Sequence, residues 1–135
     1  MKIVVIDGQG GGIGKSLIEQ IKLKISNAEV IAIGTNSVAT SCMLKAGATY
    51  AATGENSVVV ACKTADIIAG PIGIVLTDSM LGEITQKMTH AVTTSNARKV
   101  LIPISKCHTS VAGLVEKPMS KYIDDAIDII KSFYD

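Results

Sequence analysis

One stretch decides the fold of this chain: Asp7-Gly8-Gln9-Gly10-Gly11-Gly12-Ile13-Gly14-Lys15-Ser16. It lies between a short apolar run, residues 3–6, and residues 13–25, where isoleucine and leucine recur at helical spacing. Five glycines within seven positions cost backbone entropy, and a simple turn needs only one or two of them. A strand, a glycine-rich turn and an amphipathic helix in this order are typical of the first unit of a nucleotide-binding α/β fold.

The rest of the chain alternates strand-like apolar runs with helical patterns. Further strands are expected at 30–33, 49–52, one or both of 66–69 and 72–76, and 99–104, with helices at about 36–45, 55–64, 81–94 and 119–133. This alternation predicts right-handed βαβ units. Residues 1–135 are therefore predicted to form one α/β, three-layer, Rossmann-like nucleotide-binding domain with a mainly parallel sheet of five or six strands.

The composition excludes several other classes of protein. The 135 residues are 47% hydrophobic and 3% aromatic, and the formal net charge is +1. Without a basic excess, and with few rings to stack on bases, nucleic-acid binding is not expected. No apolar run approaches the roughly 18 residues of a membrane span. The three cysteines form neither a zinc nor a disulfide pattern. We therefore expect a cytoplasmic protein that binds no membrane and no metal.

The glycine-rich stretch predicts an anion site, because amides at a helix start point toward a bound phosphate and the helix dipole favours its charge. The predicted nucleotide- or phosphate-binding residues are Asp7, Gly8, Gln9, Gly10, Gly11, Gly12, Ile13, Gly14, Lys15, Ser16, Thr35 and Asn36. Two of these also have a simpler structural explanation. Asp7 can bind the amides of its own loop, and Asn36 can cap the next helix.

Two known phosphate loops resemble the stretch in part. Gly8, Gly12 and Gly14 match GxxxGxG, which resembles the cofactor loop of short-chain dehydrogenases and implies NAD(P). Those enzymes also use a Tyr-x-x-x-Lys pair, and no tyrosine here has lysine four residues later. The stricter dinucleotide pattern GxGxxG fails, because its third glycine falls on Ile13.

The second resemblance is to nucleoside triphosphatases. The sequence Gly14-Lys15-Ser16 matches the end of GxxxxGK[ST], although the first glycine of that motif falls on Gln9. Residues 11–16 also resemble the deviant loop of the partition and nitrogenase-reductase ATPases, although the signature lysine of that family falls on Gly10 here. This resemblance implies that Lys15 reaches the phosphates, that Ser16 ligates Mg²⁺, and that Asp78 serves as the second acidic motif.

Over its full length the chain resembles a family of short bacterial proteins of uncharacterised function that carry DGQGGGIG, here residues 7–14, beside the N-terminal strand. The resemblance implies a nucleotide-binding-like fold and brings no reaction with it. The cofactor stays open between NAD(P) and a mononucleotide, because no acidic residue follows the second strand to bind ribose hydroxyls.

Three side chains are weak catalytic candidates: Asp78, Cys107 and His108, each in a loop after an expected strand. A cysteine beside a base can act as a nucleophile, although neighbours in sequence usually point apart. Whether the protein is an enzyme stays open. The alternatives are a non-catalytic structural or interaction domain with a relic glycine loop, and a small deviant phosphate-loop NTPase.

Self-association is also expected. The chain is rich in aliphatic residues and its net charge is close to zero, so copies repel one another little. Three of the four aromatic residues, Tyr122, Phe133 and Tyr134, lie in the closing segment. Because aromatic residues favour interface cores, we predict a homodimer formed through the last helix or the long loop before it.

Overall fold

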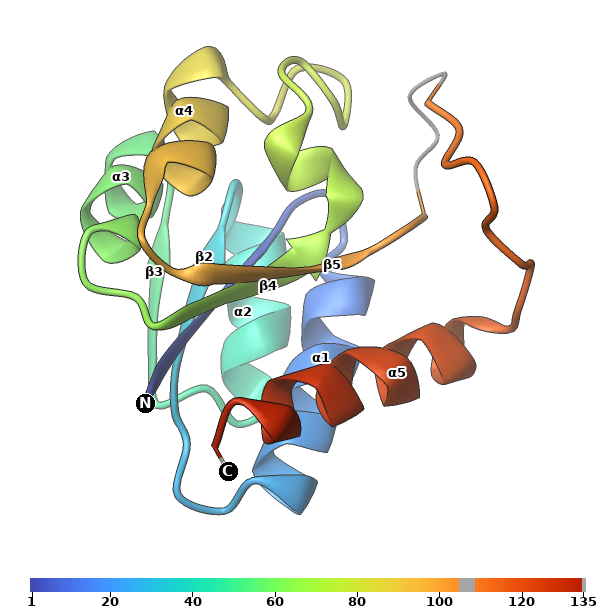
Figure 1. Cartoon of the computed structure of the whole chain (residues 1–135). Coiled ribbons are helices and arrows are strands. Elements are labelled where there is room, and N and C mark those ends of the chain that lie inside the picture. Colours follow the sequence, from blue (N-terminus) through green and yellow to red (C-terminus); the bar gives the residue numbers. More distant parts are fainter. Residues whose placement is uncertain (105–108, 135) are drawn as a thin grey trace.

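The computed structural model describes residues 1–104 and 109–134, and within them five parallel strands form one sheet (Figure 1). The strand order is β3-β2-β1-β4-β5. The strands are β1 (Lys2–Asp7), β2 (Glu29–Gly34), β3 (Tyr50–Thr53), β4 (Ile67–Pro71) and β5 (Arg98–Ile102). This confirms the predicted Rossmann-like α/β sheet, with five strands in the described part of the chain.

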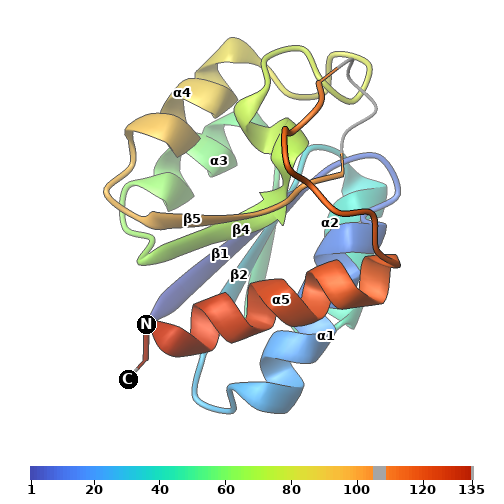
Figure 2. The same ribbon diagram turned by 45° about the vertical axis from the view of Figure 1, so that its right-hand side comes forward.

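Helices cover both faces of the sheet, which makes three layers (Figure 2). On one face lie α1 (Gly12–Lys24), α2 (Ser37–Lys45) and α5 (Met119–Ser132), and on the other lie α3 (Glu55–Cys62) and α4 (Gln86–Thr94). Successive side chains of β1 point to opposite faces of the sheet. Ile3 and Val5 pack with α1 and α5, whereas Val4 and Ile6 pack with α3 and α4. All four side chains are buried, and each contributes about 1.5–3 kcal/mol of burial free energy.

The central strand β1 pairs with β2 on one side and with β4 on the other. The chain leaves β1 toward β2 and β3 and then returns to add β4 and β5 beside the other edge of β1. Strand order therefore reverses between β1 and β4. In open parallel sheets, ligands bind in the crevice at the carboxyl ends of the strands at such a switch point.

Two predicted elements differ from the structure. Of the two segments 66–69 and 72–76, at least one was expected to be a strand. The second instead begins with a 3-10 helix, η1 (Ile72–Val75), which follows Pro71 at the end of β4. The helix predicted from Leu81 starts only at Gln86, after Thr85 caps it by accepting a hydrogen bond from the Met88 amide.

The segment before α4, residues 76–85, is irregular, and we call it the Glu83 loop. Asp78, Met80 and Leu81 have left-handed φ angles of 67°, 57° and 56°. The Glu83 amide closes a turn by donating to the Met80 carbonyl. Leu81 lies in this turn, outside the helix expected to start there, and it is 98% exposed.

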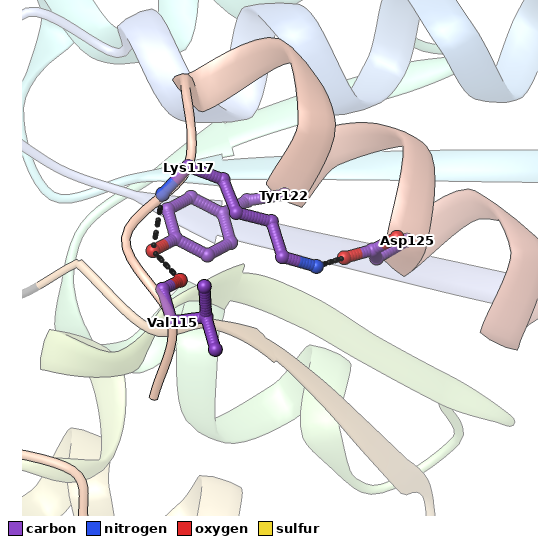
Figure 3. Close-up of polar contacts among 4 residues, drawn as sticks. All are labelled: Val115, Lys117, Tyr122 and Asp125. Carbon is purple, nitrogen blue, oxygen red and sulfur yellow. Dashed lines mark hydrogen bonds and ion pairs between the residues drawn. The ribbon is translucent and has the colours of Figure 1, made fainter. Parts of the chain in front are cut away.

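A second irregular segment, residues 109–118, precedes α5 and projects from the body of the molecule; we call it the arm (Figure 1). Tyr122 of α5 fixes its end (Figure 3). The Tyr122 hydroxyl donates to the Val115 carbonyl at 2.9 Å and accepts from the Lys117 amide at 3.2 Å. Lys117 in turn pairs with Asp125 at 2.6 Å.

Candidate functional site

Asp7 ends β1, and its carboxylate binds the amides of the glycine loop, residues 8–14. Its Oδ1 accepts from the Gly8 amide at 2.8 Å, and its Oδ2 accepts from the Gly14 amide at 2.7 Å. Asp7 is 4% exposed. Burial raises the pKa of Asp7 above its ordinary value, against the lowering effect of these hydrogen bonds and one from Ile13, and the charge of Glu83 raises it further. The structural role predicted for Asp7 is confirmed.

Three glycines of the loop are needed by the fold itself. A Cβ at Gly8 would lie 2.7 Å from the sulfur of Met80. A Cβ at Gly14 would lie 3.0 Å from the Cβ of Asp7, because α1 starts close against β1. Gly11 has a φ of 75°, which side chains rarely adopt. These three positions exclude other residues for reasons of space or backbone conformation.

Gly10 and Gly12 are different. Both are exposed, neither has a left-handed φ, and a Cβ at either position would meet nothing within 4 Å. Neither of their amides has a hydrogen-bond partner among residues 1–104 and 109–134. The fold of this chain therefore does not account for glycine at these two positions, and two backbone N–H groups there are open to a ligand.

Gly10 lines a groove of about 840 Å³ between α1 and α2. The other residues that line it are Lys15, Glu19, Ser37, Val38, Ser41, Cys42, Lys45 and Ala46. Its charged lining residues are two lysines and one carboxylate, Glu19, which lies 4.0 Å from Lys15. The groove thus combines cationic, hydroxyl and amide donors beside the start of α1.

Ser16 lies away from this groove. It lines a separate depression between α1 and α5, together with Met119 and Ser120. The structure therefore brings Lys15, but not Ser16, to the groove beside Gly10. A phosphate-loop ATPase needs both side chains on one nucleotide, so this arrangement disfavours that alternative.

Glu83 is a site residue that the sequence did not reveal. Its Oε1 accepts three hydrogen bonds: from the Thr35 hydroxyl at 2.5 Å, the Asn36 amide nitrogen at 2.8 Å and the Gln9 backbone amide at 3.0 Å. Asn36 also donates to the Gln9 carbonyl at 3.0 Å. Glu83 thus joins the ends of β1 and β2. We call Glu83, Gln9, Thr35 and Asn36 the Glu83 clasp.

The pKa of Glu83 lies below its ordinary value. Partial burial raises it, but the hydrogen bonds from Thr35, Gln9 and Asn36 lower it by more. Glu83 is therefore an anion at neutral pH. No local pattern indicates this role, because Glu83 is 74 residues from Gln9 and falls within a stretch with helical periodicity.

The remaining predicted residues divide as follows. Asn36 accepts from the Ala39 amide at 2.9 Å, which confirms its predicted role as a helix cap. Asp78 is exposed on the Glu83 loop, and its side chain makes no hydrogen bond or ion pair with the described residues. Cys107 and His108 lie outside the described residues.

No group of three or more histidine, cysteine, aspartate or glutamate side chains is placed to hold a metal ion in the described ranges. No helix there has the length and apolarity needed to cross a bilayer.

Comparison with known proteins gives a family match and a partial similarity to a solved structure. A family model described as "Domain of unknown function (DUF3842)" matches residues 2–135. No curated protein sequence matches. Among solved structures, the chain is similar to a dodecameric FMN-dependent UbiX-like decarboxylase from Escherichia coli O157:H7. That match has 13% sequence identity and a TM-score of 0.49, and it covers 97% of this chain and 77% of the decarboxylase chain.

Proposed function

The chain belongs to the DUF3842 family, and we propose that it binds the phosphate group of a nucleotide or dinucleotide at the start of α1. The phosphate would accept hydrogen bonds from the Gly10 and Gly12 amides and pair with Lys15. The rest of the ligand would occupy the groove between α1 and α2. The carrying observation is that Gly10 and Gly12 are exposed glycines that the fold itself does not require.

The cost of glycine supports this reading. Glycine at the first turn of a helix weakens that helix by up to about 1 kcal/mol relative to alanine. At Gly12 neither a close neighbour nor a left-handed φ explains that cost. A bare backbone does allow a phosphate to approach the amides closely. Binding of an anion is therefore a physical reason for glycine at this position.

The charges around the two glycines also support an anionic ligand. Helix α1 has no acidic residue in its first turn, and although Asp7 accepts from the Gly14 amide, the Gly12 amide at the start of the helix stays open to an anion. Lys15 and Lys45 both line the groove, and Ser37 and Ser41 add hydroxyl groups. A volume of about 840 Å³ lies within the usual range for small-molecule sites, and a nucleotide fits such a volume.

Triphosphate hydrolysis does not follow from this site. Asp7 occupies the Gly14 amide, which a phosphate loop would offer to the nucleotide, and Ser16 lies beside α5 instead of in the groove. We therefore favour binding without hydrolysis, and the ligand stays open between NAD(P) and a mononucleotide.

Self-association stays a proposal as well. Tyr122 of α5 is buried in the core, and Phe133 and Tyr134, which follow α5, pack against the same core, so these aromatic residues mainly serve the monomer. A homodimer would instead use exposed apolar residues of the arm, such as Val115. Light scattering of the Val115→Asp variant would then show a smaller mass than the wild type.

The test is a binding measurement with inorganic pyrophosphate, ADP and NAD by calorimetry. Gly12→Val should abolish binding, because its side chain would project into the space that the phosphate needs, while the protein stays folded. Lys15→Ala should weaken binding about tenfold through loss of one charge-assisted contact. Asn56→Val is the matched control, since it adds the same side chain to the first turn of α3. If folded Gly12→Val binds all three probes as the wild type does, this function is excluded.

A further inference from the structure

The three donors of the Glu83 clasp form an oxyanion site, and the oxygen that they bind belongs to the protein's own Glu83 carboxylate. A backbone amide, a hydroxyl and a carboxamide all point their hydrogens at one oxygen, Glu83 Oε1. Donors of these kinds bind phosphate or carboxylate oxygens equally well. The second oxygen, Oε2, has no partner among the described residues. The carboxylate is therefore held through a single oxygen, at donors that another anion can use.

The donors are fixed independently of Glu83. Asn36 is anchored through its Oδ1, which accepts from the Ala39 amide at the start of α2, and its nitrogen also bonds to the Gln9 carbonyl. The Thr35 amide donates to the Asp7 carbonyl at 3.0 Å, which ties the end of β2 to the end of β1. Departure of Glu83 would thus leave the donors in place and open to another anion.

The loop that carries Glu83 is held in a costly conformation. Asp78, Met80 and Leu81 all have left-handed φ angles, which residues with a Cβ rarely adopt. Leu81 contributes no burial to offset this strain, because it is almost fully exposed. Backbone hydrogen bonds within the loop, such as that from the Asp78 amide to the Ile84 carbonyl, hold its turns, and the buried Ile84 anchors it to the core. The Ser79 hydroxyl also donates to the Gly73 carbonyl, and Met80 lies against Gly8. The hydrogen bonds of Glu83 tie this strained loop to Gln9 at the end of β1 and to Thr35 and Asn36 at the end of β2.

The Glu83 loop lies over the place where a ligand would enter. Met80 and Glu83 cover Gly8 at the carboxyl end of β1, beside the switch point between β1 and β4. Gln9, whose amide binds Glu83, is followed directly by Gly10 with its open amide. A ligand that binds the Gly10 amide and extends toward the end of β2 must compete with Glu83.

We propose that the Glu83 loop is a lid that keeps the switch-point crevice closed, and that an anionic group of the ligand opens it by displacing the Glu83 carboxylate from Gln9, Thr35 and Asn36. This proposal rests on the proposed phosphate-binding function. It adds that the ligand carries an anionic group reaching the end of β2, as a diphosphate does. Because Glu83 is ionised at neutral pH, it competes there as a full negative charge.

The experiment compares four proteins: wild type, Glu83→Ala, Glu83→Gln and Asp78→Asn. Glu83→Ala empties the clasp, whereas Glu83→Gln keeps an acceptor oxygen and removes the charge. Asp78→Asn is the matched control, since it removes one negative charge from the same loop, and asparagine tolerates a left-handed φ. Amide hydrogen exchange of residues 76–85 is measured without ligand, and inorganic pyrophosphate binding is measured by calorimetry.

In Glu83→Ala, residues 76–85 should exchange faster, and pyrophosphate should bind about tenfold more tightly because its internal competitor is gone. Glu83→Gln should fall between the wild type and Glu83→Ala, and it serves as the test should Glu83→Ala fail to fold. Asp78→Asn should behave as the wild type does. Pyrophosphate binding that is equal or weaker in both Glu83 variants would overturn the lid while leaving the phosphate site intact. Absence of binding in every variant would instead refute the phosphate site and the lid with it.

Discussion

Asp7 and Glu83 accept hydrogen bonds from different amides of the same glycine loop, Asp7 from Gly8 and Gly14 and Glu83 from Gln9. One carboxylate is buried at the end of β1, and the other comes from the Glu83 loop beyond β4. Their charges interact, since the negative charge of Glu83 raises the pKa of Asp7. The protonation of the buried residue therefore depends on whether the other carboxylate is in place.

The first prediction concerns this coupling. Glu83→Gln should lower the pKa of Asp7, because it removes a nearby negative charge while keeping an acceptor for the Gln9 amide. Carboxyl ¹³C NMR titration of both proteins measures this shift, and Asp78→Asn is the control for a charge removed elsewhere on the loop. An Asp7 pKa that is the same in wild type and Glu83→Gln would contradict the coupling.

The raised pKa of Asp7 also makes the stability of the protein depend on pH. The folded-state pKa of Asp7 lies above its ordinary value of 3.8, so the folded protein holds the Asp7 proton more tightly than the unfolded chain does. Asp7 therefore contributes stability that is fully present below that value and is lost as the pH rises through the folded-state pKa. In Glu83→Gln, the interval between the ordinary and the folded-state pKa of Asp7 should be narrower, so Asp7 should contribute less to this pH dependence.

The second prediction separates the glycines that the fold needs from those that it does not. Gly14→Ala should lower the free energy of unfolding by about 1–3 kcal/mol, because the new Cβ overlaps the Met43 sulfur and crowds Asp7. Gly12→Ala should leave it unchanged or raise it by up to about 1 kcal/mol, because alanine favours the helix and meets no neighbour. Urea unfolding of the two variants measures both. Equal destabilisation would show that Gly12 has a structural role.

The third prediction concerns the arm. Tyr122→Phe should lower the free energy of unfolding by about 1–2 kcal/mol, because the Val115 carbonyl and the Lys117 amide both lose the hydroxyl. Tyr122 is 7% exposed, whereas Tyr50, the control for the same change, is 63% exposed. Limited proteolysis should cut the arm faster in Tyr122→Phe only. Similar behaviour of Tyr122→Phe and Tyr50→Phe would mean that the hydroxyl does not hold the arm.

The fourth prediction concerns thiol reactivity. Burial raises the pKa of Cys62 to about 11, although Lys99 lowers it slightly, and Cys62 is 3% exposed. Cys42 is half-buried and lines the groove beside Gly10. In a Cys107→Ser background, iodoacetamide should therefore label Cys42 first, and pyrophosphate should slow that labelling. Mass spectrometry follows both sites. Labelling of Cys62 at the rate of Cys42 in the folded protein would disprove the assignment.

The central part of the fold could be predicted from local sequence. The apolar run 3–6, the glycines after it and the helical spacing that follows are all contiguous signals, and β1, the loop and α1 formed where they were expected. Asp7 and Asn36 were also predictable as partners of backbone amides, because each needs only neighbours in sequence or the loop that it begins.

The Glu83 loop could not be predicted in the same way. Leu81, Ile84 and Met88 follow helical spacing, yet only Ile84 and Met88 are buried, because left-handed residues turn the chain at Met80 and Leu81. Glu83 acquires its partners only when β4 is placed beside β1, which no local pattern encodes. Likewise, the sequence could not distinguish Gly10 and Gly12 from Gly14, since their difference lies in neighbours from other elements.

The central position of β1 sets a condition on how the chain can fold during synthesis. Strand β1 is made first, but its pairing with β4 joins residues such as Ile3 and Ile67, which lie 64 positions apart. Contacts of this range form slowly, because a long loop must close before they stabilise anything. On the ribosome, one edge of β1 therefore waits unpaired until β4 has emerged, and the Glu83 clasp can form only later still. Codon changes that slow translation between residues 71 and 83 should lengthen the lifetime of that half-paired intermediate.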